Sequence, residues 1–392
     1  MIRIKPDAHE WGLYWMVSGG SVFGYLSAFM LPVLVAPLIE GFGFNEYEIG
    51  IVFTLELSGI ALAAIVSAMR AHSANLRLIG IAGVIIACLG HTISILTESV
   101  PVFGISRVLA GIGEGAVLAT TFAAAARASV PERAFAVSQI TIIIIAMALL
   151  VATPRLVAIW DYRAGIAGIL AALIVFAPSV MMLPVDRGKS VLGIAGKEMS
   201  ALPHLIVGSL VLAVYVLMNI ADMGIWAFSE RTGNSIGIAP NRIGEALATA
   251  QFLGIVGSMA AAIIATRFGR MIPMTLALFA CIGVVVMIGV PPNAAVWTAG
   301  VFSLPFVTLF FWPYLLGALA ALDELGVWTA LGGAASAAGV AIGPILAGYL
   351  AERFSYREMT WILCLIVLIG VVLIHVANRR PSPWHSEDEV VT

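Results

Sequence analysis

The chain has 392 residues, of which 61% are hydrophobic and 11% are charged, with a formal net charge of −2 and a mean hydropathy of +1.05. Soluble domains are typically about 45–50% apolar and about 25% charged, because they must cover their surface with polar groups. The composition therefore excludes an ordinary soluble domain and indicates a protein that folds in a lipid bilayer. The small net charge gives no indication of a nucleic-acid partner.

Apolar runs long enough to cross the hydrocarbon core, which takes about 20 helical residues, occur along the whole chain. The first run is too long for the core of a signal peptide, so we expect it to remain in the mature protein. Charges or turn-forming residues separate the runs. The sequence thus predicts an all-α membrane protein with twelve transmembrane helices, over residues 12–38, 47–69, 77–97, 101–125, 134–153, 164–185, 204–228, 241–265, 271–290, 295–319, 327–350 and 359–377.

The basic residues are distributed unevenly over the predicted loops. Thirteen of the 20 Lys and Arg residues lie in the two tails or in loops on the same side, six lie on the other side, and Arg107 lies within a span. Because cytoplasmic loops are enriched in Lys and Arg, we expect both termini in the cytoplasm. The short loops and the lack of appended domains suggest the inner membrane of a bacterium.

The longest polar stretch between spans, DRGKSVLGIAGKEMSALP, divides the chain into halves of six predicted spans. The basic segments MRAHSANLR and RFGRM follow the second span of each half. Two six-span repeats are a layout of secondary transporters. We therefore predict an N-terminal six-helix bundle over residues 1–185, a cytoplasmic linker over 186–203, a C-terminal six-helix bundle over 204–378 and a cytoplasmic tail over 379–392.

Three local patterns resemble the major facilitator superfamily of transporters. They are Arg107 followed by Gly111, Gly113 and Gly115, the segment ATRFGRM, and the segment GVAIGPILAGYLAE at 339–352. The resemblance covers nearly the whole chain, although MRAHSANLR lacks the family's usual G-x-x-x-D-R. It implies a monomer of two six-helix bundles around a central cavity, which the first, fourth, seventh and tenth spans line, and transport by rocking of one bundle against the other.

Arg107 and Glu114 are the two charged residues of the apolar stretch SRVLAGIGEGAVLATTFAAAA. A charge at the centre of a membrane costs about 2.5–3.5 kcal/mol on insertion scales, so such residues face a partner or a wet cavity. Seven residues make about two helical turns, which places both side chains on one face and roughly 10 Å apart. Each therefore needs a partner from another span.

Depth along the spans suggests how these charges are used. Glu56 and Glu114 lie near the middle of their spans, whereas Arg107 and Asp222 both lie about six residues further out. Our hypothesis is that Arg107 neutralises a carboxylate or binds a substrate anion, and that Glu114, with Glu56 and Asp222 as further candidates, is a protonatable coupling site. In the alternative, Arg107 braces neighbouring helices and Glu56 is a buried acid that joins two helices.

Most further substrate-binding candidates lie in the spans that the resemblance points inward, and Gln251 lies in the middle of the eighth span. Asn219, Asp222 and Trp226 form one helical stripe, although Trp226 could instead anchor the span at the outer interface. Aromatic side chains near the kink-forming Pro313 would suit a substrate with an apolar body, or else face lipid. The candidates for contact with substrate are Arg107, Tyr25, Asn219, Trp226, Gln251, Phe311 and Trp312.

Several other features point to packing rather than chemistry. His91 lies in a peripheral span and is predicted to be a satisfied packing histidine. The three cysteines lack metal-ligand spacing, and no metal or other cofactor is expected. The glycines of LAGIGEG do not follow the G-x-G-x-x-G spacing of a nucleotide loop, and favour close helix packing.

These observations favour a secondary active transporter of a small organic solute, amphipathic, aromatic or anionic, that is coupled to protons or else to sodium. There is no G-x-x-x-x-G-K-[ST] motif of an ATPase and no H-E-x-x-H motif of a metalloprotease, so an enzyme is not expected. The alternatives are a proton antiporter that exports amphipathic compounds, a lipid flippase on the same fold, and a transporter-like sensor that binds solute without moving it.

Overall fold

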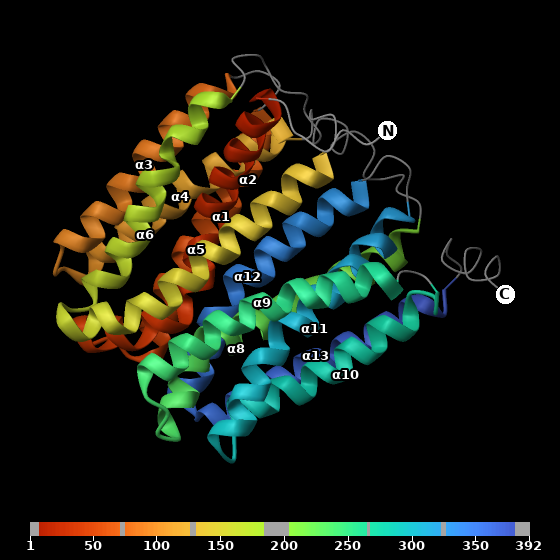
Figure 1. Ribbon diagram of the computed structural model, residues 1–392. Helices are drawn as coiled ribbons and strands as arrows, with labels where there is room; N and C mark the ends of the chain where they lie inside the picture. The colour runs from red at the N-terminus through yellow and green to blue at the C-terminus, as the bar shows by residue number, and fades with distance from the viewer. Residues whose placement is uncertain are drawn as a thin grey trace. The chain divides into compact units, whose positions relative to one another are not determined.

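The computed structural model describes residues 8–70, 75–125, 131–183, 204–264, 267–322 and 327–380 (Figure 1). The predicted linker at 186–203 and nearly all of the tail lie outside these ranges. In the described ranges, twelve helices are long and apolar enough to cross a membrane, which confirms the predicted fold class. The helices are α1 (Ala8–Phe42), α2 (Glu46–Arg70), α3 (Leu76–Leu96), α4 (Val100–Ala125), α5 (Pro131–Ile159), α6 (Arg163–Phe176) continued by the 3-10 helix η1 (Ala177–Met182), α8 (Leu205–Ser235), α9 (Pro240–Ile264), α10 (Met271–Gly289), α11 (Ala294–Ala320), α12 (Val327–Arg353) and α13 (Tyr356–Asn378).

Local sequence signals mark several helix ends. The side chain of Asn75 accepts hydrogen bonds from the first backbone N–H groups of α3, and Asn293 and Ser355 cap α11 and α13 in the same way. Each cap satisfies a donor that the helix itself cannot pair. At the other end of α1, Gly43 adopts a left-handed φ of 71°, which stops the helix at little steric cost.

The chain divides into two compact units. Unit 1 contains Met1–Phe42 and Leu55–Ile194, and unit 2 contains Gly43–Thr54 and Ala195–Thr392. The division between Ile194 and Ala195 lies outside the described residues, so the predicted domain bounds stay a prediction. The difference from the predicted halves is the segment Gly43–Thr54, whose helical part is the beginning of α2 and belongs with unit 2.

In unit 1, α1 is the central helix. Of the residues in its most apolar window 72% are buried, against 28% for α5. Helix α1 packs against α4, α5 and α6, and α3 packs along α4. Small residues allow α1 to approach its neighbours, because a Cβ at Gly20 would overlap the side chain of Thr121. The centre of unit 1 is thus built around α1 and α4.

In unit 2, glycines bring α12 close to α8 and to the beginning of α2. A Cβ at Gly343 would lie 2.9 Å from Met223 of α8, and one at Gly50 would lie 2.6 Å from the carbonyl oxygen of Pro344. The hydroxyl of Thr54 donates to the carbonyl of Ala341 over 2.7 Å. The beginning of α2 is therefore in backbone contact with α12.

A charged cluster also holds the beginning of α2 in unit 2. Arg231 Nη2 of α8 donates to Glu46 Oε1 over 3.0 Å, and the hydroxyl of Tyr356 donates to the same oxygen over 3.1 Å. Both members of the ion pair are about three-quarters buried, with side-chain exposures of 25% and 21%. The cluster ties α2, α8 and α13 together at one end of unit 2.

Candidate functional site

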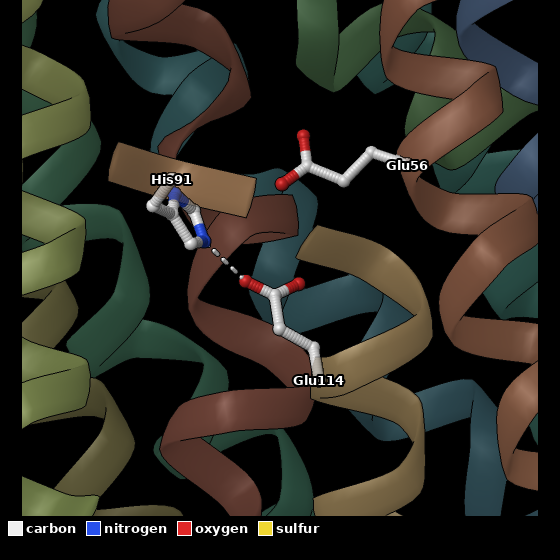
Figure 2. Close-up of side chains that lie close together, drawn as sticks. All are labelled: Glu56, His91 and Glu114. Atoms are coloured by element: carbon white, nitrogen blue, oxygen red, sulfur yellow. Dashed lines mark hydrogen bonds and ion pairs between the residues drawn. The ribbon is translucent and has the colours of Figure 1, made fainter. Parts of the chain in front are cut away.

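Four helices of unit 1 bring polar side chains together inside an apolar bundle. Glu56 of α2, His91 of α3, and Arg107 and Glu114 of α4 are each at most 3% exposed. Figure 2 shows Glu56, His91 and Glu114 converging from these three helices. Ser27 of α1 completes the group, which we call the α1–α4 polar cluster. Burial of so many polar groups is tolerated only where they satisfy one another.

Glycines on two sides of α4 allow the cluster to form. A Cβ at Gly111 would overlap the carbonyl oxygen of Glu56, and a Cβ at Gly115 would overlap that of Ile60, so this side of α4 touches the backbone of α2. A Cβ at Gly113 would overlap the backbone of Ala87 on α3. The segment G-I-G-E-G therefore provides close helix packing, as the sequence predicted.

Arg107 donates in several directions. Its Nη1 donates to Glu56 Oε1 over 3.2 Å, and its Nε donates to Ser94 Oγ over 3.0 Å. Its Nη2 contacts Ser94 Oγ and also donates to His91 Nδ1 over 3.4 Å. The guanidinium lies 5.6 Å from the ring centre of Phe103. Arg107 is thus surrounded by partners from α2, α3 and α4 itself.

These contacts define the tautomer of His91. An arginine can only donate, so Nδ1 of His91 must accept the bond from Arg107, and the ring hydrogen lies on Nε2. The Nε2–H then donates to Glu114 Oε1, 2.7 Å away, along the dashed line of Figure 2. A neutral histidine therefore connects the arginine of the cluster to its second carboxyl group.

The two oxygens of Glu114 differ in their surroundings. Oε1 accepts from His91 and also from the hydroxyl of Ser27, over 3.0 Å. Oε2 is buried and has no hydrogen-bond partner in the described part of the chain. Because Oε1 already accepts two bonds, a proton bound by Glu114 would lie on Oε2.

The same three side chains could in principle ligate a metal ion. One donor atom from each of Glu56, His91 and Glu114 lies within 4.8 Å of the others. However, the Arg107 guanidinium donates to Glu56 Oε1, and Nε2 of His91 carries a hydrogen in the tautomer described above. A positive charge and a protonated nitrogen facing the site oppose a cation, so the donor set fits a proton better than a metal.

The cluster differs from the sequence hypothesis in the carboxylate that lies beside Arg107. Arg107 pairs with the carboxylate of Glu56, although the hypothesis placed Glu56 at the depth of Glu114. The pair can form because the long arginine side chain spans the offset along the helix axis. His91, which was predicted to be a satisfied packing histidine, has a partner for both ring nitrogens, and these bonds link Arg107 to Glu114. The available signal was the pair His91 and Ser94, one turn apart on an otherwise apolar helix.

In unit 2 the predicted stripe on α8 is buried. The amide of Asn219 donates to the carbonyl of Tyr215 over 2.8 Å and accepts from Ser336 over 3.3 Å, so its polar atoms are largely satisfied. Asp222 is 9% exposed, and its carboxylate forms no hydrogen bond or ion pair with any residue that the structure describes. Trp226, on the same helix, is buried as well.

The remaining candidates lie in both units: Tyr25 belongs to unit 1, and Gln251, Phe311 and Trp312 belong to unit 2. Tyr25 is 37% exposed although its neighbours in α1 are buried, and its ring lies 6.3 Å from that of Phe122 in unit 1. Gln251 and Phe311 are buried in unit 2. Trp312 is half-buried, with its ring 5.0 Å from Tyr215 and 5.3 Å from Phe311. Tyr215 therefore joins Phe311 and Trp312 in an aromatic group that sequence analysis described only in part.

Comparison with known proteins agrees with this architecture. The sequence model of the Major Facilitator Superfamily matches residues 17–322. No curated protein matches the sequence significantly. Among solved structures, a D-xylose-proton symporter is similar with a TM-score of 0.72 and 15% identity, over 96% of this chain and 99% of that chain.

Two other transporters have the same fold. A bacterial homologue of the human lysosomal transporter Spinster, solved in an inward-facing and unoccupied conformation, matches with a TM-score of 0.69 and 13% identity, over 99% of this chain and 98% of that chain. A POT family transporter in complex with 5-aminolevulinic acid matches with a TM-score of 0.74 and 10% identity, over 94% and 96%. At these identities the likeness concerns the fold alone.

Proposed function

Since the chain belongs to the Major Facilitator Superfamily and is a multi-pass membrane protein, we propose that it is a secondary active transporter that moves a small organic solute together with protons. The observation that carries the proposal is the buried Glu114 Oε2, which has no hydrogen-bond partner in the described part of the chain. A lone buried oxygen beside a fully partnered one is a suitable place to load and release a proton.

The charges of the α1–α4 polar cluster support this assignment. Arg107 carries one positive charge, Glu56 carries one negative charge, and His91 is neutral in the tautomer described above. The cluster is therefore neutral when Glu114 holds a proton and carries one net negative charge when it does not. An uncompensated charge in an apolar interior is costly, so release of the proton favours a rearrangement that brings water or a cation to Glu114.

Arg107 acts in this proposal as a brace and electrostatic partner. Its bonds to Glu56, Ser94 and His91 use most of its donors, which leaves few for a substrate anion. Contact with substrate falls instead to Tyr25 in unit 1 and to the group of Tyr215, Phe311 and Trp312 in unit 2. These aromatic side chains suit a solute with an apolar or aromatic body.

Asp222 supports a second candidate function, proton-coupled export of amphipathic cations. It is a buried carboxylate without a hydrogen-bond partner among the described residues, so it offers negative charge to a cationic solute or a second place for a proton. Asn219 lies about one turn away and Trp226 lies one turn further on. In this version of the proposal, solute and proton exchange at Asp222 while Glu114 keeps its proton.

Topology and location complete the proposal. The excess of Lys and Arg on one side places both termini in the cytoplasm, and the short loops fit the inner membrane of a bacterium. The protein works as a monomer, as the superfamily resemblance implies. The D-xylose-proton symporter offers a precedent, at the level of fold, for movement of a solute with a proton.

The test is proton movement in proteoliposomes that contain a pH-sensitive dye. Pools of organic acids, sugars, nucleosides and cationic drugs are added to wild-type protein, Glu114→Gln, Asp222→Asn, and the control Glu98→Gln, whose side chain is 85% exposed. We expect one pool to drive proton flux that Glu114→Gln abolishes and Glu98→Gln leaves unchanged.

The other outcomes discriminate between the candidates. Flux that survives in Glu114→Gln and is lost in Asp222→Asn assigns coupling to Asp222. Solute uptake without proton flux in any pool, and with a dependence on sodium, contradicts proton coupling altogether.

A further inference from the structure

A groove lies on the surface of unit 2 between α10 and α13, two helices that pack against each other. In Figure 1 these helices run side by side along their length. The groove has a volume of about 320 Å³ and is lined by Phe279 of α10 and, on α13, by Val371, Val372, His375, Val376 and Arg379. None of these residues belongs to the α1–α4 polar cluster or to the substrate candidates.

The groove faces the surroundings of the protein. Phe279 is 53% exposed, Val372 is 56% exposed and Val376 is 39% exposed. Both helices are long and apolar enough to span a membrane. Apolar side chains on the outside of such helices contact lipid, because no aqueous phase reaches them at that depth. The natural occupant of the apolar part is therefore an acyl chain.

The chemistry changes towards the end of α13. His375 lies one turn beyond Val371, and Arg379, the C-terminal cap of the helix, lies one turn further. From Val371 to Arg379 the groove extends by eight residues, or roughly 12 Å. Basic groups thus lie at the end of the span, where lipid headgroups begin, and apolar groups lie deeper.

The polar end is suited to an anion. The Nδ1 of His375 bonds the carbonyl of Val371 over 2.8 Å, and since a carbonyl only accepts, Nδ1 carries the hydrogen and Nε2 is left for a ligand. Among the described residues no acidic side chain lines the groove. Arg379 therefore provides positive charge that no carboxylate of the groove offsets.

We propose that this groove is a binding site for a phospholipid with an anionic headgroup. The acyl chain lies along Phe279, Val371 and Val376, and the phosphate contacts Arg379 and the imidazole of His375. Every phospholipid offers acyl chains and a phosphate, but only an anionic one keeps a net negative charge, so the arginine gives the site its preference. The site rests on unit 2 alone and does not depend on the proposed transport mechanism.

Native mass spectrometry of the full chain tests the proposal. The protein is equilibrated in micelles with equal amounts of phosphatidylglycerol and phosphatidylcholine that carry identical acyl chains. We expect one phosphatidylglycerol to be retained in preference to phosphatidylcholine. Arg379→Gln should lower that preference about fivefold, the effect of one basic residue near a membrane surface. Arg380→Gln is the matched control, because Arg380 is adjacent and exposed but does not line the groove.

A second variant tests the apolar part. Val376→Trp fills the groove from an exposed position, so the fold should persist, which an unchanged melting temperature would verify. We expect it to reduce retention of both lipids.

Three results would overturn the proposal. The first is equal retention of the two lipids by the wild-type protein, and the second is an equal effect of Arg379→Gln and Arg380→Gln. The third is a rise in melting temperature with inorganic phosphate that equals the rise with phosphatidylglycerol. That result would assign the groove to a free anion.

Discussion

At the scale of the residue, the central feature is a neutral histidine between an arginine and a carboxyl group. His91 can accept from Arg107 only through Nδ1 and can donate to Glu114 only through Nε2, so its protonation is determined by its neighbours. The arrangement gives the two oxygens of Glu114 different roles, since one is held by donors and the other is open. A substitution at His91 should therefore change the hydrogen bonding of Glu114.

The first prediction concerns His91. His91→Leu removes an acceptor from Arg107 and a donor from Glu114, and each buried polar group left unpaired costs about 1–3 kcal/mol. His91→Gln offers an amide oxygen and an amide N–H, which can replace both. We expect the leucine variant to unfold at a lower temperature and to lose ligand-dependent proton flux, and the glutamine variant to keep most of both. Equal behaviour of the two variants would show that His91 serves packing alone.

The second prediction concerns the pair of Arg107 and Glu56. Glu56→Leu leaves a buried arginine without its carboxylate, which costs about 3–5 kcal/mol, whereas the double change Glu56→Leu with Arg107→Met should recover a large part of that loss. The unfolding free energy of each variant in detergent gives the comparison. The control is Arg242→Gln, which removes a surface pair worth at most about 1 kcal/mol. A double variant as unstable as Glu56→Leu would argue against direct coupling of the pair.

At the scale of the element, the spacing between helices determines whether the polar cluster exists. Helix α4 meets α2 through Gly111 and Gly115 and meets α3 through Gly113. At each of these glycines the nearest atoms belong to the backbone of the neighbouring helix. The short bonds of Arg107 and Glu114 depend on this approach, because a helix displaced by one methyl group would lengthen them. The glycines of α4 are thus part of the site although they carry no chemistry.

The third prediction follows from this spacing. Gly111→Ala adds a methyl group that meets the carbonyl oxygen of Glu56, and overpacking of this kind costs about 1–3 kcal/mol. Gly104→Ala is the matched control on the same helix, since the nearest neighbour of its Cβ, Leu55, is 3.9 Å away. Thermal unfolding in detergent should separate the two variants, and equal stability would contradict the close α2–α4 contact.

Helix α2 also shows how one element can serve two units. Its beginning is held in unit 2 by Arg231 and Tyr356 and by the backbone of α12. Glu56 is the second residue past the division between Thr54 and Leu55 and belongs to the cluster of unit 1. Helix α2 therefore contributes its beginning to unit 2 and Glu56, the partner of Arg107, to unit 1.

At the scale of the whole molecule, the charge asymmetry predicts the orientation. With both termini in the cytoplasm, the turn between α3 and α4 lies on the opposite side of the membrane. A membrane-impermeant maleimide applied to intact cells should label Glu98→Cys and should leave Arg380→Cys unlabelled until the membrane is opened. The native cysteines lie within spans and should react little in this assay. The reverse labelling pattern would invert the topology.

Much of the fold was predictable from the sequence because the bilayer imposes simple rules. Apolar length determines where spans occur, and the twelve predicted spans correspond in order to the twelve helices of the described chain. The predicted boundaries fall short by several residues at helices such as α1. This helix continues to Phe42 and ends where Gly43 adopts a left-handed backbone conformation. A predicted span ends where the run of apolar residues gives way to polar ones, whereas the helix itself ends where the backbone leaves the helical conformation.

The sequence by itself determined that this is a membrane protein, that twelve spans cross the bilayer, and that Arg107 and Glu114 share a helical face and need partners. Helical periodicity supplies the face and depth of a residue, and these follow from local geometry alone. Which helix lies opposite is a property of tertiary packing. Only the structure therefore assigned Glu56 to Arg107, gave His91 its place beside Glu114, and joined the beginning of α2 to unit 2.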